Sequence, residues 1–92
     1  MLLSYGVTAV IVEKMRDAID MVMHKSGAYP TSIIVGVDVV GSIDFHFSDA
    51  YIRRAVSPMR DRLCMFGIPL TIDYSHPTHV EVCEGIIVNT DI

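Results

Sequence analysis

The sequence predicts an α+β domain: one long N-terminal helix packed on a three- to five-stranded, mostly antiparallel sheet, plus a short second helix. Three observations predict this class. Apolar residues recur at three- and four-residue steps in the first third, apolar and polar residues alternate in the last third, and Gly and Pro mark the junctions. A chain of 92 residues has room for one hydrophobic core, so residues 1–92 form a single domain.

The first predicted element is a helix over residues 8–26. Thr8 is a suitable N-cap, and Gly27 is a typical C-terminal stop. Met21 lies off the apolar stripe, so we expect it to contact something outside the domain. The stripe itself consists of Ile11, Met15, Ala18, Ile19, Val22 and Met23.

The middle of the chain begins with a β-branched run over residues 32–37, which predicts a buried strand. The following stretch is ambiguous. Asp38 could cap a short helix, whereas three apolar residues from Ile43 onward alternate with polar ones, as in a half-exposed strand. We favour a turn or short helix up to Gly41 and strand character over residues 43–47.

Helical character is expected again after this strand. Ser48 or Asp49 can cap a second helix over residues 50–56. Pro58 limits this helix, because the residue before a proline avoids the α region. A helix can resume over residues 59–64, with the proline at its first turn.

The C-terminal third is predicted to be β structure. Residues 68–74 and 79–83 each alternate apolar and polar side chains, with a turn over 75–78, which predicts an antiparallel hairpin. Pro69 places the first of these runs at a strand start or at a sheet edge. Residues 86–88 form a final apolar run.

Composition bears on partners and compartment. Hydrophobic residues make up 51% of the chain, and a domain of this size buries only about 60–65% of its unfolded surface. The excess predicts a homo-oligomer or another protein partner. The net charge of −4 makes nucleic-acid binding unlikely. Residues 1–12 lack a basic flank and a cleavage motif and are too short to cross a bilayer, so we expect a cytoplasmic protein without membrane contact.

Residues that could carry chemistry form no recognisable catalytic or cofactor motif. The spacing of His76, His79 and Cys83 is the only one that resembles a metal site, and it lacks the second ligand pair of a structural zinc site. The alternative is that both histidines lie in water. Cys64 and Cys83 are interpreted as buried free thiols. We therefore expect no enzymatic activity, no cofactor and no bound metal.

Basic residues are concentrated in one short segment near Tyr51. The segment has three interpretations: a solvated face, a contact with the acidic face of a neighbouring copy, or a small nucleic-acid footprint. The candidate partner-binding residues are Tyr51, Arg53, Arg54, Arg60 and Arg62.

Two segments carry a resemblance to a known group of proteins. Residues 65–73, followed by His76 and Pro77, resemble a Gly-Ile-Pro-Val-x-Val-Asp strand and proline-containing turn in small proteins and capsid-type modules of tailed bacteriophages and prophages. Residues 29–36 are similar to the Pro-Thr-x-Ile-x-Val-Gly strand opening of the same proteins. The resemblance implies a structural, assembly or accessory role in the host cytoplasm or the virion. It brings no catalytic residues.

Together these observations predict a self-associating structural or protein-interaction component. An edge strand over residues 68–74 could pair with another chain. The alternative is a small regulator that binds nucleic acid or an acidic partner through the arginine segment. The expected interface residues are Met21, Phe45, Phe47, Ile68, Leu70, Ile72 and Tyr74.

Overall fold

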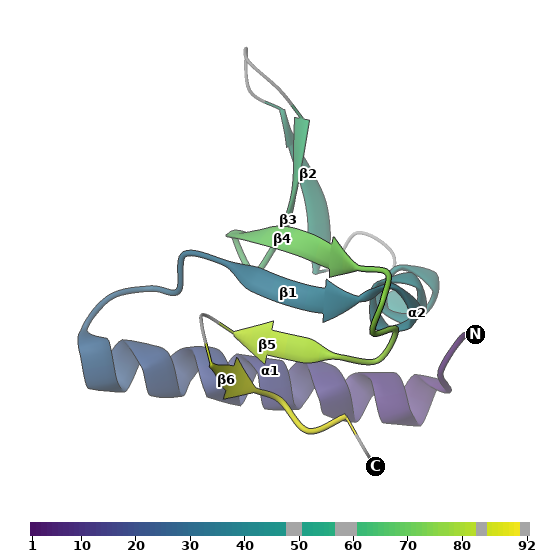
Figure 1. Ribbon diagram of the computed structural model, residues 1–92, viewed down its shortest axis with the longest axis horizontal. Helices are drawn as coiled ribbons and strands as arrows, with labels where there is room; N and C mark the ends of the chain where they lie inside the picture. The colour runs from purple at the N-terminus through teal and green to yellow at the C-terminus, as the bar shows by residue number, and fades with distance from the viewer. Residues whose placement is uncertain (48–50, 57–60, 83–84, 91–92) are drawn as a thin grey trace.

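The computed structural model describes residues 1–47, 51–56, 61–82 and 85–90, and within 53–56 and 61–62 it describes the backbone. A long helix lies across one face of a mixed sheet, and a shorter helix lies at one end of it (Figure 1). This confirms the predicted α+β class. In chain order the elements are α1 (Tyr5–Ser26), β1 (Ile33–Gly36), α2 (Val37–Phe47), β2 (Ile52–Val56), β3 (Asp61–Met65), β4 (Ile68–Asp73), β5 (Val80–Val82) and β6 (Ile86–Ile87).

The sheet has the strand order β2-β3-β4-β1-β5-β6 in the described part of the chain. Only β1 and β4 run parallel, and the other neighbouring strands are antiparallel, as predicted. Among the described residues, five strands have three or more residues, and the sixth, β6, has two. Ile33, Val35, Val80 and Val82 are buried in the core, whereas Ile34 and Glu81 alternate with them on the open face.

Helix α1 begins at Tyr5, earlier than predicted, because Ser4 and not Thr8 caps it. The Ser4 side chain accepts a hydrogen bond from the Val7 N–H at 3.2 Å. Thr8 is buried in the first turn, where its hydroxyl donates to the Ser4 carbonyl at 2.7 Å. Gly27 ends the helix with φ +71°, as predicted.

The apolar stripe of α1 is largely as expected. Its buried residues pack on the sheet, but Met23 is 40% exposed and does not belong to them. Met21 is 49% exposed, consistent with its place off the stripe. The buried positions of α1 are Thr8, Ile11, Val12, Met15, Ala18 and Ile19.

The predicted strand over residues 43–47 is wrong, because α2 is one continuous helix that directly follows β1. The N–H groups of Asp38 and Val39, in its first turn, donate to the Pro77 carbonyl at 3.0 and 3.4 Å. The buried Ser42 hydroxyl donates to the Asp38 carbonyl at 2.6 Å. The helix is thus capped by a loop distant in the sequence, which a local alternation pattern does not reveal.

The predicted helices over 50–56 and 59–64 are also wrong, and the short second helix of the predicted fold is α2 instead. Strands β2 and β3 form a hairpin with Ile52 opposite Met65. A tight turn, with Phe66 at φ 55° and Gly67 at φ 76°, leads from β3 into β4. Ladder pairing in this hairpin overrides the local helical preference.

The predicted hairpin between residues 68–74 and 79–83 is wrong, because β1 lies between β4 and β5. The loop after β4 crosses the end of β1 at Gly36, where an added Cβ would clash with the Pro77 carbonyl. The absence of a side chain at Gly36 therefore permits this crossing. Strand β4 lies inside the sheet, between β3 and β1. The prediction that residues 68–74 form an edge strand is therefore also wrong.

Candidate functional site

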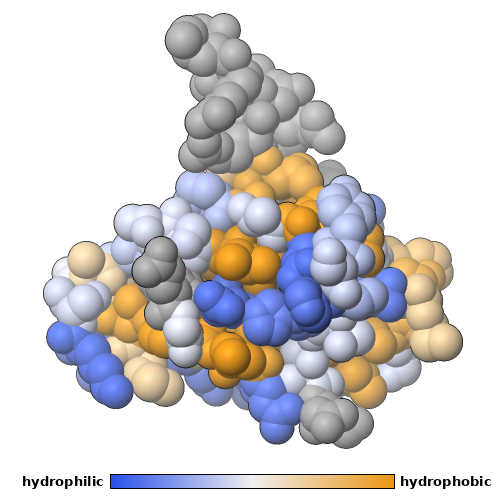
Figure 2. Space-filling model, in the orientation of Figure 1, coloured by the Kyte–Doolittle hydropathy of each residue, from blue (hydrophilic) through white to orange (hydrophobic). Residues whose placement is uncertain are grey.

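Two ionisable pairs lie on the open face of the sheet, where the carboxyl ends of β1 and β4 meet. In the parallel register Gly36 is opposite Asp73, and in the neighbouring antiparallel pair Ile34 is opposite Glu81. A band of hydrophilic side chains crosses the middle of this face (Figure 2). Strand β1 lies between β4 and β5, and this order places the carboxylates of Asp73 and Glu81 on the same surface.

The first pair joins Asp73 to His76. One Asp73 carboxylate oxygen lies 3.1 Å from His76 Nδ1. The other oxygen accepts hydrogen bonds from the backbone N–H groups of Ser75 at 2.9 Å and His76 at 3.1 Å. Asp73 therefore organises the turn that carries His76.

The second pair joins His79 to Glu81. His79 Nε2 lies 3.1 Å from one Glu81 oxygen, and the Gly85 N–H donates to the other at 3.3 Å. The His79 and His76 ring centroids are 6.1 Å apart. Both pairs, with Ile34, line one hollow of about 230 Å³.

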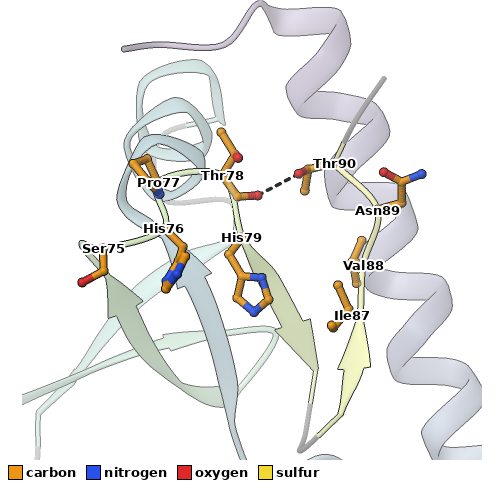
Figure 3. Close-up of a pocket in the computed structure, with 9 residues that line it drawn as sticks. All are labelled: Ser75, His76, Pro77, Thr78, His79, Ile87, Val88, Asn89 and Thr90. Carbon is orange, nitrogen blue, oxygen red and sulfur yellow. Dashed lines mark hydrogen bonds between the residues drawn. The ribbon is translucent and has the colours of Figure 1, made fainter.

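A larger neighbouring hollow, of about 610 Å³, shares both histidines. It is open to solvent, and residues 75–79 and 87–90 line it (Figure 3). In this view the rings of His76 and His79 lie side by side, and the hydroxyl of Thr90 donates to the Thr78 carbonyl at 2.7 Å. This hydrogen bond ties the C-terminal segment to the loop that carries the histidines.

Both carboxylates are held in the ionised form. Burial raises the pKa of Asp73, but hydrogen bonds from the backbone of His76 and Ser75 and from the His76 ring outweigh this effect, so its pKa is lowered. The His79 ring, followed by the Gly85 N–H, lowers the pKa of Glu81. The hollow therefore presents two negative charges at neutral pH.

The side chains of this arrangement are of types that can bind a cation. Two imidazoles and two carboxylates surround one hollow. In the described part of the chain, no three His, Cys, Asp or Glu side chains already converge as metal ligands. Sequence analysis singled out His76 and His79 but missed Asp73 and Glu81. Cys83, its third candidate, lies outside the described residues.

The predicted interface residues differ in their exposure to solvent. Phe45 and Tyr74 are 68% and 73% exposed, and Met21 is exposed as well. Ile68 is fully buried in the core, so it is not an accessible contact residue. Leu70, Ile72 and Phe47 are half-buried.

Tyr51 packs at the base of the β2–β3 hairpin. Its ring centroid is 5.3 Å from that of Phe47 and 5.5 Å from that of Phe66, and the Arg16 guanidinium lies 5.9 Å from its centre. Tyr51 thus anchors the hairpin to the body. For Arg53, Arg54 and Arg62 the structure describes the backbone in β2 and β3, and Arg60 lies outside the described residues.

Strands β2 and β3 form an arm that projects from the body of the molecule (Figure 1). We call Ile52–Val56 and Asp61–Met65 the hairpin arm. The two strands pair with each other along their full length, whereas β3 pairs with β4 only at Cys64 and Met65. Strand β2 ends the strand order, so its outer edge has no strand partner among the described residues.

Comparisons with family models, curated proteins and solved structures produce no match to this chain. Within the described residues, none of the helices has the length and apolar character required to span a membrane. Fold and surface geometry define a small α+β domain with a projecting hairpin and an acidic, histidine-bearing open face.

Proposed function

We propose that this protein is a self-associating structural or protein-interaction component and not an enzyme. In this proposal the hairpin arm of one copy binds the exposed side of α1 in another copy, where Asp17 and Asp20 lie. The projection of the arm from the body supports the proposal most directly. We also infer a cytoplasmic location, and the resemblance to small phage proteins is consistent with an assembly role.

The outer edge of β2, which has no strand neighbour in the described part of the sheet, favours a contact with another molecule. A two-stranded hairpin is at best marginally stable in water unless a third strand or another layer covers it. The arm is joined to the body at its base, by Ile52 and by the two residue pairs with β4. A second copy packed against the arm would provide the missing cover.

Charge favours the acidic body of another copy as the surface that receives the arm. Residues 52–65 contain four arginines and one acidic residue, Asp61, a net charge of +3. Because the whole chain carries −4, the remaining residues carry −7. Opposite charges of this size steer two copies together and align them.

The exposed side of α1 offers a suitable surface. A hollow of about 870 Å³ is lined by Asp17 and Asp20, by the apolar Met21 and Met23, and by His24 and Lys25. Carboxylates can pair with arginine, and exposed methionines adapt to apolar partner side chains. In this proposal Met21, which lies off the apolar stripe of α1, contacts the hairpin arm of another copy.

Direct pairing of β2 with β2 of another copy is less favourable. A symmetric antiparallel pairing would bring the Arg53 and Arg54 positions of both copies into one short ladder. Like charges opposite each other on paired strands are destabilising. The contact between arm and body avoids this repulsion.

Light scattering over a concentration series tests the proposal. We expect a mass above that of one chain, which falls toward the monomer when Arg53→Ala and Arg54→Ala are combined, or when Asp17→Asn and Asp20→Asn are combined. Asp44→Asn, a matched change at an exposed carboxylate of α2, should leave the mass unchanged. Circular dichroism checks that each variant is folded.

A wild-type protein that stays monomeric at high concentration would contradict the proposal. The alternative, binding of nucleic acid through the arginine segment, is tested on the same samples with labelled DNA and RNA. Binding by the monomer that weakens steeply with salt would favour that alternative.

A further inference from the structure

We propose that His76 and His79 form a binding site for a divalent first-row transition-metal ion such as Zn²⁺. The ion would take one nitrogen from each ring, and Asp73 and Glu81 would supply the neighbouring negative charge. This inference is independent of self-association, because the site lies on the open face of the sheet and not on the hairpin arm.

The spacing of the two rings is suited to one ion. With zinc–nitrogen distances of about 2.0–2.1 Å, two imidazoles on a tetrahedral ion have centroids about 5 Å apart. The observed separation is 6.1 Å, so the two rings must approach each other by about 1 Å to bind the same ion. The His76 side chain is 74% exposed, so there is space around it for this approach.

Each histidine already has the carboxylate neighbour typical of a metal ligand. Metal-binding imidazoles usually donate their second N–H to a carboxylate or a backbone carbonyl, which orients the ring and raises its basicity. Here His76 lies 3.1 Å from Asp73, and His79 lies 3.1 Å from Glu81. Two such pairs around one hollow make a stronger indication than the His-x-x-His spacing alone.

The backbone that carries the two rings is held from several sides. The Gly36 N–H donates to the His79 carbonyl at 2.6 Å, and the Pro77 carbonyl accepts from the first turn of α2. The Asp73 side chain holds the turn before His76. Because hydrogen bonds already hold this loop in place, the loop loses little conformational entropy when an ion binds.

The donor set selects the class of ion. Imidazole nitrogens favour Zn²⁺, Ni²⁺, Co²⁺ and Cu²⁺, whereas Mg²⁺ and Ca²⁺ require mainly oxygen ligands. The hollow of about 230 Å³ leaves room for water molecules to complete the coordination. The ion would therefore be held by two protein nitrogens with water in the remaining positions.

The test is a titration of metal-free protein with Zn²⁺ at neutral pH, followed by calorimetry and by NMR of the histidine ring protons. We expect one ion per chain and shifts of the His76 and His79 signals, while the His24 and His46 signals stay in place. Mg²⁺ at the same concentrations should shift none of them.

Substitutions assign the ligands. His76→Ala and His79→Ala should each weaken Zn²⁺ binding at least tenfold, and Asp73→Asn or Glu81→Gln should weaken it about tenfold. The matched control His24→Ala, an exposed histidine in the last turn of α1, should bind like the wild type. Circular dichroism confirms that each variant is folded.

Three results would overturn the proposal. The first is the absence of binding, the second is affinity unchanged by His76→Ala, and the third is binding that leaves both ring signals in place and is abolished by alkylation of the cysteines. The third result would assign the ion to Cys64 or Cys83 instead.

Discussion

The Asp73 carboxylate connects the end of β4 to the loop that carries both histidines of the open face. Hydrogen bonds from Ser75 and His76 lower its pKa in the folded protein despite the opposing effect of burial. A carboxyl whose pKa is lowered by folding stabilises the native state above its unfolded pKa. That stability is lost as the pH falls through the folded pKa.

We therefore predict that Asp73→Asn lowers the free energy of unfolding at pH 7. The free energy of unfolding of this variant should also change less with pH in the acidic range. The wild type should lose stability as the pH falls below about 4, and the difference between the two proteins should shrink there. Urea unfolding at a series of pH values measures this. Asp44→Asn serves as the control, and a constant difference down to pH 2 would contradict the prediction.

Residue patterns in the sequence located some of these side chains and not others. Met21 was recognised from its angular position on α1, because a helix has a fixed period. Glu81 was not recognised, because its alternation in β5 resembles an ordinary solvent-facing strand position. Its role depends on the His79 ring two residues earlier, which the pleat places on the same face.

At the scale of elements, the crossing of the loop after β4 over the end of β1 decides the order of strands. Gly36 ends β1, and its backbone lies against Pro77. The Pro77 carbonyl in turn accepts hydrogen bonds from the first turn of α2. The contact between Gly36 and Pro77 therefore connects β1, α2 and the loop that carries the candidate site.

Gly36→Ala should consequently destabilise the protein by about 1–3 kcal/mol, because the new Cβ must displace backbone atoms of the loop. Gly41→Ala in α2 is the matched control. Its Cβ would meet only the Leu2 side chain at 3.8 Å, so we expect a gain of about 0.5–1 kcal/mol from helix propensity. Thermal and urea unfolding measure both changes, and equal effects would refute the close-packing argument.

The elements that were predicted correctly have strong local signals. Helix α1 shows a stripe over several turns, and β1 and β4 show apolar character between turn residues. The middle of the chain has short, mixed patterns, so α2 was assigned partly to a strand and β2 and β3 to helices. In these segments capping by Pro77 and pairing between strands outweigh intrinsic preference.

At the scale of the whole molecule, the hairpin arm leaves the compact body and gives the proposed assembly its geometry. If folded copies bind one another, association stabilises the folded state by mass action, and the melting temperature depends on protein concentration.

We predict that a hundredfold increase in protein concentration raises the melting temperature by several degrees. The combined variant Arg53→Ala and Arg54→Ala should lose most of this dependence. Differential scanning calorimetry at matched heating rates measures it, and an identical melting temperature across the series would count against self-association.

The sequence by itself determined the α+β class of this chain, with a long N-terminal helix and β structure in its last third. Those features follow from periods of 3.6 and 2 that are written into neighbouring residues. Only the tertiary structure decided that β1 lies between β4 and β5, that α2 is helical throughout, and that the Asp73–His76 and His79–Glu81 pairs face one hollow. The strand order and the contacts of Pro77 with the first turn of α2 depend on hydrogen bonds between residues far apart in the chain, which a local pattern does not contain. Each of the two pairs is local in the sequence, and the position of β1 between β4 and β5 brings them to one hollow.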